Sequence, residues 1–99
     1  MTITFTLNDK GTPSGKLADA ELHFSGGPLD GLRLLGFAIW ERRGGTRTVT
    51  FPARQYTVNG ERRSFALLRP VVDPAGQDRL RDLILHAYQE HEAAVAATA

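Results

Sequence analysis

The sequence predicts an α+β fold: an antiparallel β-sheet of about five to six strands with one C-terminal amphipathic helix packed on it. Three observations predict it. Residues 1–72 contain repeated stretches in which apolar and polar residues alternate, the period of a half-buried strand. Turns rich in glycine and proline separate these stretches. Residues 73–95 instead carry apolar residues at the three- and four-residue spacing of a helix.

The length and composition of the chain favour one domain in a reducing compartment. Its 99 residues suffice for a single core, so we expect residues 1–99 to form one domain. The absence of cysteine excludes disulfides and thiolate metal sites. The N-terminal residues do not read as a signal peptide, and no run is apolar enough to span a membrane. We therefore expect a cytoplasmic protein that makes no contact with a membrane.

The first two expected strands form a hairpin. Residues 2–7 alternate threonine with apolar residues, and residues 18–24 alternate apolar with polar residues. Turn-forming residues are dense between them, over residues 8–15. Each strand therefore has one apolar face for the core.

The third expected strand, residues 32–40, is apolar on both faces and must be covered on both. We expect Leu35, Phe37 and Ile39 to face the helix. A second copy of the chain is expected to cover the other face, so the predicted homodimer interface is formed by Leu32, Leu34, Ala38 and Trp40. The alternative is that the rest of the sheet curls over this face.

Two turn signals organise the remaining strands. An Arg-Arg-Gly-Gly turn leads into a strand that ends at Pro52, because proline lacks the backbone donor that a strand ladder needs. Asn59-Gly60 is the strongest turn signal in the chain, since both residues tolerate positive φ. This turn joins residues 55–58 to residues 64–68.

The helix is expected over residues 73–95. Asp73 is a favourable N-cap, and Pro74 occupies the first helical position, where its missing N–H costs nothing. The apolar stripe that packs on the sheet consists of Leu80, Leu83, Ile84, Ala87, Tyr88, His91 and Val95. Residues 96–99 are expected to fray.

The chain carries no recognisable catalytic or metal-binding motif. His86 and His91 are five residues apart and point to different faces of the helix, whereas a helical metal site favours a spacing of four. The glycine-rich residues 25–31 lead into a strand, whereas a phosphate-binding loop leads into a helix. We expect no enzymatic activity, no cofactor, no bound metal and no small-molecule substrate.

Positive charge is concentrated between Gly31 and Val72, where eight arginines stand against two glutamates while the rest of the chain is acidic. Arginine binds phosphate or carboxylate with two parallel hydrogen bonds. An aromatic ring close to arginines can stack on an unpaired base. The expected nucleic-acid-binding residues are Arg47, Arg54, Tyr56, Arg62, Arg63 and Arg69. The alternative is that some arginines pair with acidic residues of the helix and the N-terminal strands.

The order of motifs resembles the SpoVG family of bacterial septation and sporulation regulators. The family's Met-Pro-Ser-Lys-Arg, Gly-Glu-Phe-Arg-Asp and His-Pro-Ile motifs have as counterparts Phe51-Pro52-Ala53-Arg54, Gly60-Glu61-Arg62-Arg63 and Arg69-Pro70-Val71. Residues 80–88 are similar to the family's closing helix. The resemblance implies a small, non-enzymatic homodimer that binds DNA or RNA as a regulator, with Arg54 and either Arg62 or Arg63 in the basic positions.

A second function also fits the sequence. The chain departs from the family pattern at Gln55, which reduces the paired basic residues to Arg54 alone. Its helix ends in Glu90 and Glu92, which would repel phosphate. The alternative is a protein-interaction module that recruits a protein partner through its sheet edge or its arginine-rich face, without nucleic-acid binding.

Overall fold

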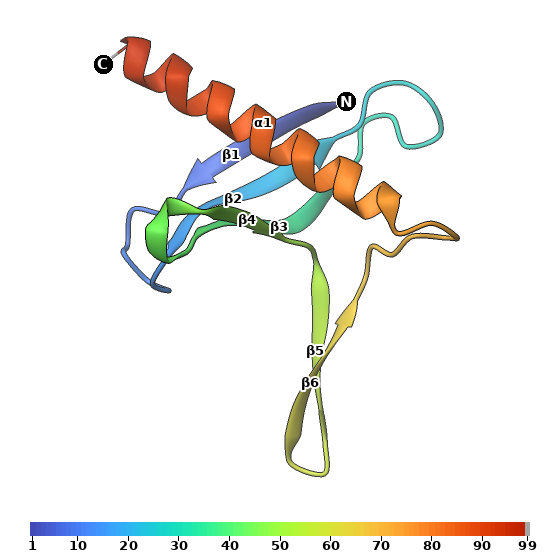
Figure 1. Cartoon of the computed structure of the whole chain (residues 1–99). Helices are drawn as coiled ribbons and strands as arrows, with labels where there is room; N and C mark the ends of the chain where they lie inside the picture. The colour runs from blue at the N-terminus through green and yellow to red at the C-terminus, as the bar shows by residue number, and fades with distance from the viewer. Residues whose placement is uncertain (99) are drawn as a thin grey trace.

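The computed structural model describes residues 1–98, and these residues form an α+β fold, as predicted (Figure 1). A short 3₁₀ helix, η1 (Arg43–Gly45), separates the third and fourth strands. The other elements are β1 (Thr2–Leu7), β2 (Lys16–His23), β3 (Arg33–Glu41), β4 (Arg47–Thr50), β5 (Ala53–Val58), β6 (Glu61–Ala66) and α1 (Ala75–Thr98). Over residues 1–98, no helix has the length and apolar character that crossing a membrane requires.

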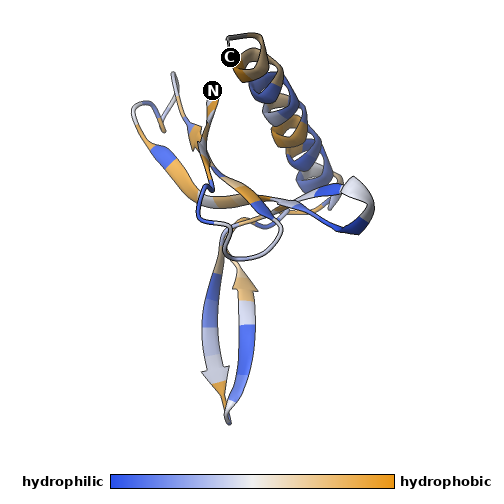
Figure 2. Ribbon diagram, turned by 90° about the vertical axis from the view of Figure 1, so that its left-hand side faces the viewer, coloured by the Kyte–Doolittle hydropathy of each residue, from blue (hydrophilic) through white to orange (hydrophobic). Residues whose placement is uncertain are grey.

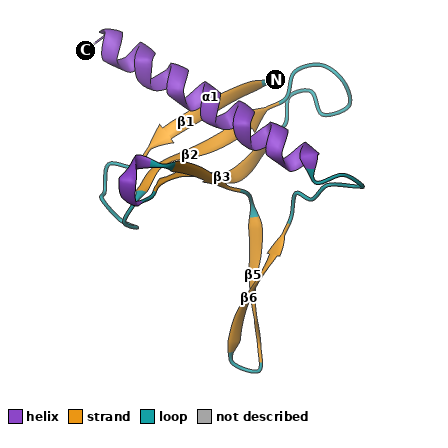
Figure 3. Ribbon diagram, viewed as in Figure 1, coloured by secondary structure: helices purple, strands orange, loops and turns teal. Residues whose placement is uncertain are grey.

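The six strands form two sheets instead of the single sheet expected. Strands β1 to β4 make a four-stranded antiparallel sheet in the order β1-β2-β3-β4. Within the described residues, β5 and β6 pair only with each other, and this hairpin, residues 53–66, stands away from the sheet (Figures 1 and 3). We call it the arm. The chain leaves the four-stranded sheet at Pro52, which has no N–H to continue the ladder.

The core lies between the four-stranded sheet and α1, which covers one face of that sheet and leaves the other open (Figure 2). Phe37 and Ile39 of β3 and Ile84 of α1 are the largest fully buried side chains. The rings of Phe5 and Tyr88 meet edge to face with their centroids 5.2 Å apart. This is the packing that the alternating strands and the helical stripe predict.

The helix starts where its capping residues predict and ends later than expected. The Asp73 carboxylate accepts a hydrogen bond from the Ala75 N–H at 2.9 Å, as an N-cap does. Helical structure continues to Thr98, three residues beyond the expected end at residue 95, and the expected fraying of this segment stays a prediction. Residue 99 lies outside the described residues.

A bulge in β3 changes which of its residues face the helix. Leu34 pairs with Leu22 and Phe37 pairs with Ala20, so β3 advances by three residues over a stretch in which β2 advances by two. Gly36 lies within this segment and has a φ of +103°. One extra residue in a strand reverses the faces on its far side. Leu34 therefore packs against the core, while Leu35 is 52% exposed. The expected orientation of Leu34 and Leu35 is wrong for this reason.

The four residues expected at the dimer interface consequently do not share one face. Ala38 and Trp40 lie on the sheet face away from α1, where the Trp40 Nε1–H donates to Thr50 Oγ1 at 2.8 Å. Leu34 lies on the helix side. Leu32 precedes β3 and is 58% exposed. The open face of the sheet carries Leu35, Ala38 and Trp40 instead.

Candidate nucleic-acid interface

The arm is held to the fold only at its base. The Leu67 N–H donates to the Pro52 carbonyl at 3.0 Å and closes the two ends of the hairpin. Every residue of β5 is exposed, and so are the first five residues of β6. A two-stranded hairpin that packs on nothing is marginally stable in water, because it buries little apolar surface. The arm is therefore a surface of the molecule and adds little to its core.

The register of the hairpin divides the arm into two faces. Residues that stand opposite each other in an antiparallel pair share a face, and Tyr56 stands opposite Arg63 while Arg54 stands opposite Phe65. One face, which we call the aromatic face, consists of Arg54, Tyr56, Val58, Glu61, Arg63 and Phe65. The other, which we call the polar face, consists of Ala53, Gln55, Thr57, Arg62, Ser64 and Ala66.

Two exposed rings lie among the arginines of the aromatic face. Tyr56 is 41% exposed and Phe65 is 48% exposed. The guanidinium of Arg69, just beyond the arm, lies 4.9 Å from the centre of the Phe65 ring, which is a cation–π contact. This contact places Arg69 beside the aromatic face.

The arginines of the arm differ in how far their charge is already neutralised. The guanidinium of Arg63 contacts the Glu61 carboxylate at 3.1 Å. Among residues 1–98, no carboxylate lies within 4.0 Å of the guanidinium of Arg54 or of Arg62. Both of these guanidinium groups are therefore open to an incoming anion.

Arg47 does not belong to this surface, although its sequence position suggested that it would. Its guanidinium forms a bidentate salt bridge with the Glu92 carboxylate, with 3.0 Å between Nη2 and Oε2. The same guanidinium lies 5.4 Å from the centre of the Tyr88 ring. The hydrogen bond that the Arg47 guanidinium donates to the Glu92 carboxylate raises the pKa of Arg47 above its usual value. Arg47 therefore links β4 to α1, and it neutralises one of the two glutamates expected to repel phosphate.

The sequence-predicted site is thus brought together in part. The arm carries or adjoins five of the six predicted residues, namely Arg54, Tyr56, Arg62, Arg63 and Arg69. Arg62 lies on the polar face, and the other four lie on or beside the aromatic face. Phe65 was missed. The Asn59-Gly60 turn contained the signal, because a two-residue turn fixes the register and places residue 65 across from residue 54.

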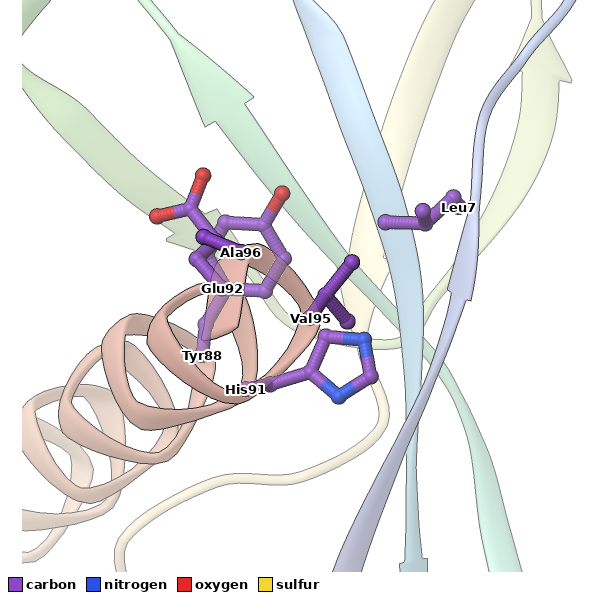
Figure 4. Close-up of a pocket in the computed structure, with 6 residues that line it drawn as sticks. All are labelled: Leu7, Tyr88, His91, Glu92, Val95 and Ala96. Carbon is purple, nitrogen blue, oxygen red and sulfur yellow. The ribbon is translucent and has the colours of Figure 1, made fainter. Parts of the chain in front are cut away.

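A hollow lies between the end of β1 and the last turns of α1 (Figure 4). It measures about 320 Å³ and is lined by Leu7, Tyr88, His91, Glu92, Val95 and Ala96. Burial raises the pKa of the Tyr88 hydroxyl further above its ordinary value, and the Glu92 carboxylate is paired with Arg47. This lining offers no paired nucleophile and base.

Metal-ligating side chains are also dispersed. In the part of the chain that the structure describes, no three histidine, cysteine, aspartate or glutamate side chains gather closely enough to hold a metal ion. His91 lies against apolar groups, with its ring 5.3 Å from that of Phe5. The arm is thus the strongest candidate for a functional surface.

No protein-family model, curated protein or solved structure matches the chain.

Proposed function

We propose that the protein is a non-enzymatic, SpoVG-like cytoplasmic regulator that binds DNA or RNA through the arm and acts as a homodimer. One observation carries this proposal: a hairpin that stands free of the fold presents arginines and two exposed aromatic rings. Each strand of the arm has six residues, which corresponds to a reach of roughly 20 Å. That length is sufficient to lie along several nucleotides.

Charge supports a phosphate-containing partner. The arm holds Arg54, Arg62 and Arg63 against the single carboxylate of Glu61, and Arg69 adds a further positive charge beside it. Arginine binds phosphate oxygens with its planar fork of N–H donors, and such contacts supply most of the affinity in nucleic-acid complexes. The acidic end of α1 lies elsewhere, with Glu92 paired to Arg47.

Binding is tested by fluorescence anisotropy of labelled DNA and RNA at two salt concentrations. The double variant Arg54→Ala with Arg62→Ala is expected to bind about 100-fold more weakly, because each charged hydrogen bond contributes roughly a factor of ten. The slope of log affinity against log salt is expected to fall by about 1.4 to 1.8, since two phosphate contacts are lost.

Arg47→Ala is the matched control for this experiment. It removes one arginine from the same region of sequence, but it breaks the link to Glu92 and leaves the arm untouched. We expect this variant to lower the free energy of unfolding by about 1 kcal/mol and to leave the affinity for nucleic acid unchanged. Full affinity in the double variant would show that the arm is not the site.

The homodimer is supported by the open face of the sheet. Leu35 and Trp40 lie on this face, and α1 does not cover it. Two copies would carry two arms, and two linked binding elements hold one polymer more tightly than either alone.

Light scattering at micromolar concentration is expected to give twice the chain mass of 10.8 kDa, and Leu35→Arg is expected to give the monomer. Leu29→Arg, in an exposed loop, is the control, and a wild-type mass of 10.8 kDa would contradict the dimer.

A protein partner is the second candidate, and the edge of the sheet favours it. No strand of the described residues pairs with the outer edge of β1. The strand Thr2–Leu7 contains no charge and no proline, the residues that usually protect such an edge. An extended segment of another protein could add to it as a further strand. If the protein binds no nucleic acid at low salt, recruitment of a protein partner through this edge becomes the favoured function.

A further inference from the structure

The rings of the arm are exposed where nothing in the fold covers them. Tyr56 and Phe65 are on the aromatic face with Val58, and all three are between 41% and 48% exposed. Three neighbouring apolar side chains on one face of a free hairpin form the kind of exposed patch that a partner or ligand can cover. The ligand has to offer apolar area together with negative charge, because arginines surround the rings.

The spacing of the rings fits a chain of stacked bases. Tyr56 and Phe65 are diagonal neighbours across the two strands, since Tyr56 stands opposite Arg63 and Phe65 opposite Arg54. Diagonal neighbours on one face of an antiparallel pair are about 7–8 Å apart. That distance is about two steps of a nucleic-acid strand, in which successive nucleotides advance roughly 3.4 Å.

Charge and ring alternate on this face in the way that phosphate and base alternate in a single strand. Each ring stands opposite one arginine. Arg69 lies over the ring of Phe65 at 4.9 Å, and a stacked guanidinium keeps its in-plane N–H groups free to donate to phosphate. One side of the Phe65 ring is thus occupied by Arg69, while Tyr56 makes no ring contact of this kind among the described residues.

A duplex does not expose the faces of its bases, on which the rings of the aromatic face would stack. Its bases are stacked on one another, so a protein meets only their edges and the phosphates. Aromatic rings laid against phosphates would bury charge without giving it a partner. A single strand can turn its bases out and stack them on aromatic side chains.

We infer that the arm selects single-stranded nucleic acid, with Tyr56 and Phe65 stacking on unpaired bases while Arg54, Arg63 and Arg69 hold the phosphates. This inference rests on the proposed function and specifies its ligand. Arg62, which lies on the polar face and has no carboxylate partner among residues 1–98, supplies a further phosphate contact at the side of the arm.

The test compares a labelled single-stranded DNA, an RNA of the same sequence and the duplex DNA, each titrated with the full-length protein. The single strands are expected to bind at least 10-fold more tightly than the duplex. Tyr56→Ala is expected to weaken single-strand binding roughly 5- to 100-fold, the range found for removal of one stacking ring. The salt dependence is expected to stay unchanged, because no charge has been removed.

Two further variants separate stacking from other effects. Tyr56→Phe keeps the ring and is expected to bind single strands as the wild type does. Val58→Ala removes an apolar side chain of the same face and the same 41% exposure but no ring, and it is expected to leave affinity unchanged. Both positions are exposed, so the thermal unfolding of all three variants is expected to be unaltered.

The failure of this inference can be told apart from failure of the proposed function. Equal or tighter binding of the duplex, with Tyr56→Ala harmless, overturns the preference for single strands but leaves the arm as a nucleic-acid site. A change of molar mass in Tyr56→Ala, with unchanged single-strand affinity, shows that a second copy covers the rings and also overturns the inference. If the wild-type protein binds none of the three polymers at low salt, the proposed function itself fails.

Discussion

Replacing residues 53–66 with a two-glycine linker is expected to abolish nucleic-acid binding while the rest of the protein stays folded. The ends of the arm are already adjacent, because the Leu67 N–H reaches the Pro52 carbonyl at 3.0 Å. In the described residues, β5 and β6 pair with no strand of the larger sheet, and their side chains lie almost entirely outside the core. The deletion thus removes the proposed binding surface without opening a cavity.

The affinity is expected to fall by more than about 100-fold, a larger loss than in the double arginine variant, because the rings and the arginines are removed together. The melting temperature is expected to change by only a few degrees, as measured by circular dichroism. A matched deletion shortens the exposed loop between β2 and β3, residues 26–30, which contains no arginine. This control is expected to bind normally. Binding that survives loss of the arm would instead place the site at Arg42 and Arg43, beside η1.

The strands were predictable because each depends on its own sequence. Alternation in residues 2–7 specifies β1, and Asn59-Gly60 specifies the turn between β5 and β6. The separation of the arm from the sheet was not predictable in this way. An alternating strand looks the same whether it joins a sheet or stands free, since its pairing partner is decided by contacts distant in sequence.

The arginines illustrate the same limit. Two expectations were open for them, phosphate ligands or partners of acidic residues. The pairing is confirmed for some arginines, whereas phosphate binding by the others stays a prediction. Arg47 pairs with Glu92, and Arg33 contacts Glu21 of β2 at 3.4 Å. Arg54 has no such partner among residues 1–98. The Arg47 pair joins residues 45 positions apart, and only the packing of α1 on β4 brings them together.

The bulge in β3 has a second consequence, because Gly36 lies directly against the residue from which the arm departs. A Cβ atom at this position would lie 2.8 Å from the Cβ of Pro52 and 3.3 Å from its Cα. The proline ring is rigid and leads straight into β5, so it cannot move without moving the base of the arm. A glycine within a strand often marks such a close approach of backbone.

Gly36→Ala is accordingly expected to destabilise the protein by about 2–4 kcal/mol, from a strained backbone at a φ of +103° and the overlap with Pro52. For a domain of this size the melting temperature falls by at least roughly 10 °C. Gly44→Ala is the control, since its φ of +86° is also positive but no described atom lies within 4 Å of the added carbon. It is expected to lose only the backbone strain of a positive φ, about 1 kcal/mol. The difference between the two variants in thermal unfolding measures the contact with Pro52 together with the larger φ of Gly36. Equal melting temperatures would mean that Pro52 yields freely, and the bulge would then have no part in fixing where the arm leaves the sheet.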